Sequence, residues 1–559
     1  MFYLFFLLVS SLPALKSLFS PGFFDSFDGG FHLVRLIHFY NEITQGQFPV
    51  RFGTQMAFGF GYPVFNFFYP LVYYLGSLIH FFGFSFGSSL KLIIAASFIL
   101  SAIFCYHWLR QYFNSIASLA GAFLYIYSPY RFSVNFVSTS MGTILAFVFA
   151  PLLMLGITKY LIKKNKSSLS LISISTSLLL LSHNVSAMIF ISIAVFYINY
   201  LIIIFRPNFR QIKNIIYSLI LAFGLASFFI IPMVHDLKYV KLSSNIAFNY
   251  FDHFPTFKQL IYSPWGYGSS ITGPNDKESF QIGIAQWFIL GFSTFLFFIK
   301  SITQKIKSNT DKIFPFFLFA FLITIFFMLS ESNLIWQHLK IIQQIQYPWR
   351  LLMATTLITP FFTAWAIDNL KKNFRPFFFL FITLLAFYCN RNHFLTPNFY
   401  RYPDQHYIEN QNLFYGSTDI AWESRPIWSN FTPNKFPQTP FITNPDILKY
   451  QILKPKPGQR LNLQTDTQNP TTLTLNQYYY PNWLVKNNNQ VINSYPDPQN
   501  GLLTIDVPQG SNNITINYQS TPVQNISNYI SLISFAILIF LILKPRIRTT
   551  LFSSAKISS

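Results

Sequence analysis

Near the start of the chain, a carboxylate, an imidazole and a guanidinium follow one another at the spacing of one face of a helix. Two glycines follow Asp28, and His32 and Arg35 stand four and seven positions after it. In a helix that runs to Gln45, these three positions share one face. A carboxylate can take a proton from an attacking hydroxyl, and arginine and histidine can hold a phosphate leaving group. A structural role stays open as well, because aspartate before glycine also caps helices and forms turns.

Two other polar clusters lie where apolar stretches begin or end. His183 and Asn184 join two apolar stretches, where such residues are often functional but also serve as the polar caps of a helix joint. Arg350 ends the run Gln346-Tyr-Pro-Trp-Arg before another apolar stretch, a pattern also typical of an aromatic anchor at a membrane surface. Both interpretations stay open for each cluster. The sequence has no Gly-Lys-Ser/Thr phosphate loop, zinc-ligand spacing or nucleophile elbow.

The elements that must position these residues are membrane helices. Hydrophobic residues make up 52% of the 559 residues and charged residues only 10%, against about 25% in soluble domains. A bilayer crossing needs about 20 mostly apolar residues. We predict spans at 2–20, 90–109, 115–129, 140–158, 168–182, 185–205, 212–234, 282–300, 312–330, 349–367, 375–390 and 526–544. The predicted fold class is an α-helical polytopic protein of the plasma membrane, with about 12–13 transmembrane helices.

The net charge of +21 would suit a nucleic-acid partner, but its distribution argues against one. Nine of the 39 Lys and Arg residues and eight of the 18 Asp and Glu residues lie in 391–525, which is therefore nearly neutral. The other basic residues crowd the short connections between spans. Because such connections stay in the cytoplasm, we predict that loops 235–281, 331–348 and 391–525 lie outside. The charge orients the chain in a bilayer, and we expect no nucleic-acid partner.

The side on which loop 21–65 lies depends on segment 66–84. That segment is apolar, but it is crowded with Phe and Tyr and contains Pro70. Such a composition favours the membrane–water boundary over a crossing. If the segment crossed, loop 21–65 would be cytoplasmic. We predict that it does not cross, so that the loop and its polar residues lie outside.

Residues 391–525 have a different character. Asn, Thr, Gln and Pro become frequent, and the alternation of side chains predicts strands at 471–480, 483–491, 502–507 and 513–518. Asn487-Asn-Asn and Asn500-Gly501 supply turns. We therefore predict three parts. These are a multi-span domain over 1–390 with first outer loop 21–65, an extracytoplasmic β-sandwich-like domain over 391–525, and a final transmembrane helix with a basic cytoplasmic tail over 526–559.

Several motifs together resemble a bacterial family of polytopic membrane proteins that carries the label "6-pyruvoyl-tetrahydropterin synthase-related" and is similar to YfhO-like proteins. The resemblance covers nearly the whole chain, although no zinc-binding histidine set of a soluble pterin enzyme is present. The motifs are Asp28-Gly-Gly-Phe-His32-Leu-Val-Arg35, Gly46-Gln-Phe-Pro-Val-Arg51, Gly59-Phe-Gly-Tyr-Pro63-Val-Phe-Asn66-Phe-Phe-Tyr-Pro70-Leu, Ser128-Pro-Tyr130-Arg131, Leu181-Ser-His183-Asn184, Gln346-Tyr-Pro-Trp-Arg350 and Tyr479-Tyr-Pro-Asn-Trp483.

The resemblance implies the GT-C glycosyltransferase superfamily, whose multi-span enzymes transfer sugars from polyprenyl-phosphate carriers and have an acidic residue in the first outer loop. It implies that Asp28 is the catalytic base and that His32 and Arg35 bind donor phosphate or acceptor. Further substrate-binding candidates, lining the same outer cavity, are His183, Asn184 and Arg350. The implied partners are membrane lipid, a polyprenyl-phosphate sugar donor and an envelope glycan or lipid acceptor. The sequence indicates no metal ligand and leaves a divalent metal cofactor open.

The chain departs from this family at two positions. Where the family often has an Arg and then a Glu, this sequence has Ser138 and Thr143. The departure removes one cation and one carboxylate from the expected cavity. It keeps open a non-catalytic envelope scaffold or glycan-binding relative. A lipid or solute transporter is the less favoured alternative, since it would need ionisable residues deep inside several spans.

Overall fold

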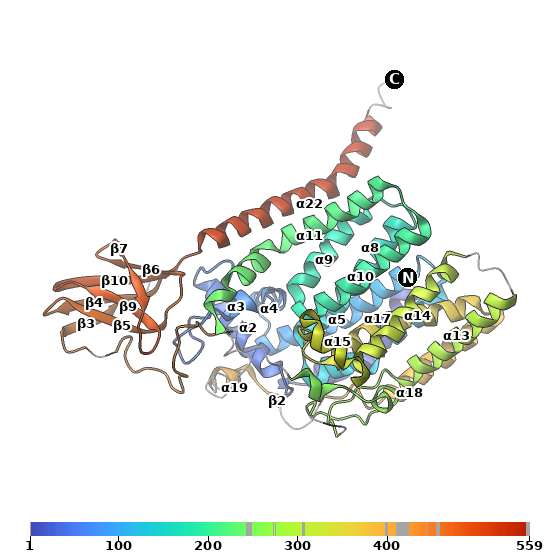
Figure 1. Ribbon diagram of the computed structural model, residues 1–559, viewed down its shortest axis with the longest axis horizontal. Coiled ribbons are helices and arrows are strands. Elements are labelled where there is room, and N and C mark those ends of the chain that lie inside the picture. The colour runs from blue at the N-terminus through green and yellow to red at the C-terminus, as the bar shows by residue number, and fades with distance from the viewer. Residues whose placement is uncertain are drawn as a thin grey trace.

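The computed structural model describes residues 2–241, 249–271, 273, 275–303, 308–396, 401–409, 424–442, 444–453 and 459–554. Figure 1 shows a large bundle of helices with a small β-domain at one end. The short helices α2 (Gly29–Thr44), α3 (Val64–Phe67) and α4 (Leu71–Phe81) lie between the two. The final helix, α22 (Pro522–Ser554), leaves the β-domain and packs along α11 (Phe209–Asp236).

Within the described ranges, nine helical segments are long and apolar enough to cross a membrane. Their helices are α5 (Phe86–Leu109), α8 (Met141–Leu161), α10 (Asn184–Phe205), α11, α13 (Ile284–Thr303), α14 (Asn309–Met328), α17 (Leu352–Asn369), α18 (Arg375–Asn390) and α22. Shorter apolar helices are α1 (Phe2–Leu15), α4, α6 (Ser115–Ile126) and α9 (Ser168–Ser182). Every predicted span coincides with one of these helices, so the predicted helical, polytopic class is confirmed.

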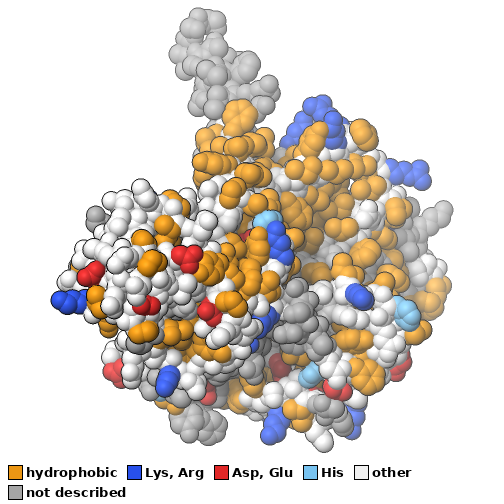
Figure 2. Space-filling view, turned by 60° about the vertical axis from the view of Figure 1, so that its left-hand side comes forward, with side chains coloured by type: hydrophobic (Ala, Val, Ile, Leu, Met, Phe, Trp, Pro, Cys, Tyr) orange, Lys and Arg blue, Asp and Glu red, His pale blue; other side chains and the backbone are white. Residues whose placement is uncertain are grey.

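The surface of the bundle differs from that of the β-domain. Figure 2 shows hydrophobic side chains over much of the helical body, α22 included, whereas the β-domain in front is mostly polar. Helices α8 and α17 are enclosed by their neighbours, while α18 and α22 expose most of their apolar residues. An apolar exterior on a helical bundle is the surface that lipid covers.

Loop 21–65 lies on the same side of the bundle as the chain that follows α18. Strand β1 (Phe23–Phe24) pairs antiparallel with β2 (Arg401–Tyr402). Directly after β2, α19 (Asp404–Glu409) begins with a carboxylate that accepts hydrogen bonds from the backbone N–H groups of Phe86 and Gly87, at 2.5 and 3.0 Å. The start of α5 is therefore on this side too.

The segment before α5 consequently begins and ends on one side of the bundle. Helix α4 has 11 residues, which at about 1.5 Å per residue is roughly half of the ~30 Å apolar thickness of a membrane. Both of its ends lie near the side that carries loop 21–65. This agrees with the predicted interfacial position of segment 66–84.

The β-domain consists of two antiparallel sheets. One has the order β3 (Ile447–Leu453), β4 (Gln459–Thr467), β10 (Gly510–Tyr518), β6 (Trp483–Asn487), β7 (Gln490–Ile492); the other has the order β5 (Thr471–Tyr478), β9 (Leu502–Val507), β8 (Ser494–Pro496). The predicted strands 471–480, 502–507 and 513–518 are present as β5, β9 and β10. The predicted strand 483–491 is instead a hairpin of β6 and β7, because Asn488 and Asn489 adopt the positive φ values of a tight turn. Strands β3, β4 and β8 were not predicted.

Loop 21–65 is built into the β-domain. Phe52 is fully buried in the β-domain core, with its ring centroid 4.9 Å from that of Trp483 and 5.5 Å from that of Tyr518. The backbone N–H of Tyr478 donates to the carbonyl of Phe60 at 2.8 Å. The β-domain is thus attached through this loop as well as through its two chain ends.

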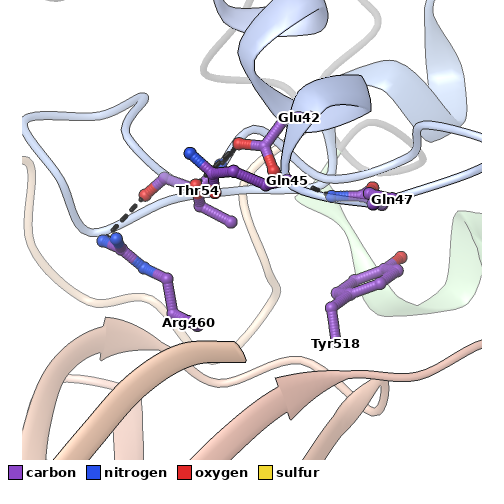
Figure 3. A pocket seen from close by; sticks show the side chains of 7 residues that line it. Glu42, Gln45, Gln47, Thr54, Arg460 and Tyr518 are labelled. Atoms are coloured by element: carbon purple, nitrogen blue, oxygen red, sulfur yellow. Dashed lines mark hydrogen bonds between the residues drawn. The ribbon is translucent and has the colours of Figure 1, made fainter. Parts of the chain in front are cut away.

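A small cavity of about 50 Å³ lies in this contact (Figure 3). On the loop side, the Glu42 carboxylate accepts hydrogen bonds from the Thr54 backbone and hydroxyl at 2.7 and 2.6 Å and from the Gln47 amide at 3.0 Å. From β4, Arg460 donates to the carbonyl oxygens of Thr54 and Gly59 at 3.2 and 3.1 Å. The charged groups of Glu42 and Arg460 are already bonded to these partners, which indicates a structural contact.

A second buried network ties the loop to α11 and α22. Arg51 donates to Asn66 at 3.1 Å, to Asn528 at 3.0 Å and to the carbonyl of Phe228 at 2.7 Å. The Asp236 carboxylate accepts from Asn66 at 2.9 Å and from Gln524 at 3.1 Å. We call the set Arg51, Asn66, Asp236, Gln524 and Asn528 the polar joint.

Candidate active site

Helix α2 presents the first three predicted residues. The backbone N–H of Asp28 donates to the Ser138 carbonyl at 2.8 Å, which fixes the start of the helix. Asp28 occupies the N-cap position, but its side chain accepts no capping hydrogen bond. Burial raises the pKa of the Asp28 carboxyl, and the nearby Arg35 and Arg350 guanidiniums oppose that rise. The carboxylate is therefore not used to hold the helix together.

His32 lies one turn further along α2 and is only 2% exposed. Its Nδ1 lies 3.0 Å from the Tyr73 hydroxyl, and its Nε2 lies 3.4 Å from the Tyr69 hydroxyl. Burial, reinforced by Arg35 and His183, lowers the pKa of His32 well below its usual range. The ring is therefore neutral at pH 7, with one nitrogen that donates and one that accepts.

Arg35 places a positive charge in the same interior, with 5% of its surface exposed. Its guanidinium carbon lies 4.0 Å from the ring centroid of Phe68, a cation–π contact, and its Nε has no hydrogen-bond partner. In the described ranges, the pairs within ion-pair distance are His235–Asp236 and Lys300–Asp311, so no carboxylate there is bonded to Arg35. A buried arginine without a bonded carboxylate is well placed to bind an anion.

Arg350 and His183 approach the α2 residues from two other parts of the chain. Arg350 lies in the turn 348–351 before α17 and donates to the Ile345 carbonyl at 3.2 Å and to the Gln346 side chain. His183, at the start of α10, accepts at Nδ1 from the backbone N–H of Ser186 at 3.1 Å. A neutral His183 therefore carries its proton on Nε2 and can donate it to a ligand.

Glu278 is a member of this site that the sequence did not predict. It lies in the loop before α13 and is 6% exposed. Its Oε1 accepts a hydrogen bond of 2.6 Å from the Ser133 hydroxyl. Burial raises the pKa of Glu278 to about 7, against the opposing effects of the Ser133 hydrogen bond and Arg350. One Glu in a long loop has no motif around it, so no sequence signal could have found it.

Electrostatic interactions join these residues into one site. Arg350 acts on Asp28, on His183 and on Glu278, and Arg35 acts on both Asp28 and His32. The set Asp28, His32, Arg35, His183, Glu278 and Arg350 is called the polar cluster below. Asn184 is not part of it: this exposed side chain turns toward α11, with its amide 3.4 Å from the Met233 sulfur.

The two positions that depart from the family pattern border the polar cluster. Ser138 supplies the carbonyl that holds the Asp28 N–H. The Thr143 hydroxyl lies 3.1 Å from that of Ser186, which in turn lies 2.8 Å from Nδ1 of His183. Hydroxyl groups thus connect Thr143 to His183. Because Ser138 and Thr143 carry no charge, the charged groups of the site are those of the polar cluster.

An apolar groove of about 570 Å³ lies next to the turn that carries Arg350. Its walls are α10, α14 and the short helix α16 (Lys340–Gln343), with Phe196, Phe319 and Ile341 among the lining residues. At one end it is lined by Ile345, whose carbonyl binds Arg350, and by Leu351, the residue after Arg350. A long apolar chain and a charged head group could therefore lie next to each other here.

The chemistry available at this site is anion binding and proton transfer. Arg35 and Arg350 supply fixed positive charge, His183 an N–H donor, and Asp28 and Glu278 two carboxyl groups. Across the described residues, no three His, Cys, Asp or Glu side chains come together in a way that could hold a metal ion.

Comparison with known proteins gives distant likenesses. No family model matches the chain. An uncharacterized protein of Lactococcus lactis subsp. cremoris (strain MG1363) is 26% identical over 243 residues, which are 42% of this chain and 39% of that protein. The chain thus spans well under half of that relative.

Two solved structures share part of the chain path. The arabinofuranosyltransferase AftD from Mycobacteria matches 71% of this chain and 27% of its own, with a TM-score of 0.47 and 14% identity. The Archaeoglobus fulgidus oligosaccharyltransferase matches 79% of this chain and 61% of its own, with a TM-score of 0.42 and 14% identity. Both neighbours are glycosyltransferases, and the likeness is one of fold alone.

Proposed function

We propose that this protein is a GT-C type membrane glycosyltransferase, within the YfhO-like relatives that its motifs resemble. It transfers a sugar from a polyprenyl-phosphate donor to a cell-envelope glycan or lipid on the outer face of the membrane. One observation carries the proposal: the apolar groove ends beside Arg350, which interacts with the Asp28 carboxylate. A lipid chain in the groove would bring its phosphate to the guanidinium.

In the proposed reaction, the acceptor hydroxyl attacks the anomeric carbon of the donor sugar. Its proton passes to the Asp28 carboxylate, the new carbon–oxygen bond forms, and the bond between the anomeric carbon and the phosphate oxygen breaks. Polyprenyl phosphate leaves with the electron pair. Arg35 and Arg350 offset the charge that develops on it, and His183 donates a hydrogen bond from Nε2.

The Asp28→Asn variant tests the proposal. The full chain in lipid nanodiscs would be given undecaprenyl phosphate carrying radiolabelled glucose, mannose or galactose, together with envelope lipids and glycans. We expect transfer by the wild type and a loss of about 10²–10⁴-fold in Asp28→Asn, because the asparagine cannot accept the proton. The matched control is Asp25→Asn, which changes an exposed carboxylate three residues away and should leave transfer unchanged.

Two outcomes would count against this assignment. Undiminished transfer by Asp28→Asn would remove Asp28 as the base. No transfer from any of the three donors by the wild type would favour the non-catalytic scaffold, for which the hydroxyl groups at Ser138 and Thr143 are the supporting observation.

Sidedness gives an independent test. A cysteine at the exposed position 25, with Cys105 and Cys389 replaced by serine, would be probed in intact cells with a membrane-impermeant thiol reagent. We expect labelling without lysis, because loop 21–65 shares a side with the β-domain, which we propose to be extracytoplasmic. Labelling only after lysis would place the loop in the cytoplasm and contradict a lipid-linked donor at the outer face.

A further inference from the structure

Glu278 has an incomplete set of hydrogen bonds. The Ser133 hydroxyl donates to Oε1, and within the described chain no donor reaches Oε2. Because the residue is only 6% exposed, little water reaches the carboxylate, and Oε2 is open to a hydrogen bond from a ligand. Near neutral pH the carboxyl can both accept and donate, which suits a hydroxyl group that does the same.

Glu278 is also held at a fixed place relative to Arg350. Phe280, two residues after Glu278, stacks on Trp349, the residue before Arg350, with ring centroids 5.5 Å apart and planes 21° apart. Tyr347 stacks on the same Trp349 ring, with centroids 5.3 Å apart. These contacts join the outer loop to the turn 348–351, so the carboxyl and the guanidinium keep a fixed spacing.

The groove, Arg350 and the two carboxyl groups follow one another in the same order as the lipid chain, the phosphate and the sugar of a lipid-linked donor. The groove would take the lipid chain and Arg350 the phosphate. The sugar, bonded directly to that phosphate, then lies beside Arg350, where the two carboxyl groups are Asp28 and Glu278. Since Asp28 is assigned to the acceptor's proton, Glu278 is left for the sugar.

We propose that Glu278 is the residue that recognises the donor sugar, by hydrogen bonds from Oε2 to its ring hydroxyl groups. The inference rests on the proposed function and extends it to the donor's sugar moiety. Glu278 therefore distinguishes a sugar-bearing polyprenyl phosphate from the bare lipid phosphate that remains after transfer. It also favours release of the product, because the bare lipid phosphate lacks the hydroxyl groups that Glu278 binds.

Comparing two lipids tests this proposal without an acceptor. The full chain in nanodiscs would be titrated by native mass spectrometry with undecaprenyl phosphate and with the same lipid carrying glucose, mannose or galactose. We expect the wild type to bind at least one sugar-bearing lipid about tenfold more tightly than the bare lipid, as for a hydrogen bond to a charged group. Glu278→Gln should remove most of that preference while binding the bare lipid as the wild type does.

Two further variants sharpen the result. Ser133→Ala removes the hydroxyl that orients the carboxyl, and we expect it to reduce the preference by a smaller factor than Glu278→Gln does. Glu331→Gln changes an exposed glutamate elsewhere and should keep the full preference. A thermal midpoint for each variant shows that the protein is folded.

The outcomes separate this proposal from the proposed function. If Glu278→Gln keeps the sugar preference, or if the wild type binds bare and sugar-bearing lipids equally, Glu278 is not the sugar-binding residue, and a lipid-phosphate site still stands. If the wild type binds neither lipid, the proposed function fails, and this proposal fails with it.

Discussion

The polar cluster and the polar joint both bury charges beside loop 21–65, but the partners of those charges differ. In the polar joint, Asp236 accepts from Asn66 and Gln524, and Arg51 makes three hydrogen bonds. In the polar cluster, Arg35 stacks on Phe68 and forms no ion pair among the described residues, and the Asp28 side chain makes no capping hydrogen bond.

The difference separates a structural site from a binding site. Opposite charges that are joined through amide side chains, as Arg51 and Asp236 are through Asn66, stabilise a contact and leave little for a ligand. Charges that lie near one another without direct ion pairs retain an electrostatic potential that a ligand can use. The joint therefore holds the loop on α11 and α22, and the cluster is the place for chemistry.

The largest expected contrast is in stability. Arg51→Met removes three hydrogen bonds and leaves the buried Asp236 without its nearby cation, so we expect a loss of about 3–5 kcal/mol in the free energy of unfolding. Arg35→Met, the matched change in the cluster, should cost less than about 1 kcal/mol, because Arg35 makes a cation–π contact with Phe68 in place of the three hydrogen bonds that Arg51 makes. Denaturation in bicelles measures both, and equal losses would break the distinction between the two regions.

A smaller effect is expected on ligand affinity. Arg350→Ala should weaken binding of undecaprenyl phosphate by about 10–100-fold, the range for a charge-assisted hydrogen bond, with an unchanged thermal midpoint. Arg391→Ala, which removes an exposed arginine at the outer end of α18, serves as the control. Equal affinities in both variants would show that the phosphate does not bind at Arg350.

The smallest effect concerns pH. The pKa of folded His32 lies below its unfolded value of about 6.5, so on acidification the unfolded chain binds a proton that the folded chain does not. Stability is therefore full above pH 6.5 and is lost as the pH falls below it. We expect His32→Gln to flatten this decline by up to about 1.4 kcal/mol per pH unit.

Thermal midpoints of the wild type and of His32→Gln at pH 7.5 and pH 5 measure that change. His183 contributes with the same sign, since burial and Arg350 lower its pKa to about 3, so part of the decline remains in the single variant. Parallel declines in the two proteins would show that His32 is not buried as a neutral ring.

Local sequence patterns predicted much of the fold and part of the site. The spacing of Asp28, His32 and Arg35 placed them on one face of α2, and Gly46, with φ of 92°, follows the end of that helix. The length of the apolar stretches predicted the spans, and the alternation of polar and apolar side chains predicted strands such as β5 and β9. These signals are readable because they depend only on residues within one helix or one strand.

Adjacency in the sequence does not decide which side chains meet, because tertiary packing does. His183 and Asn184 were predicted together as binding residues, yet only His183 joins the cluster. The change of backbone direction between α9 and α10 turns the next side chain toward α11. For the same reason, Phe52 belongs to the core of a β-domain that follows about 400 residues later.

By itself, the sequence determined a polytopic helical membrane protein with a β-rich domain before its last helix, because hydropathy, charge and side-chain alternation are local properties. Only the tertiary structure decided that Glu278 meets Ser133, 145 residues away, that Arg350 acts on both Asp28 and Glu278, and that Ile345 and Leu351 beside Arg350 line an apolar groove. These features depend on how helices far apart in the chain pack, and packing is set by the shapes of many side chains at once. The bilayer limits where the helices can lie, but the contacts between them assemble the site.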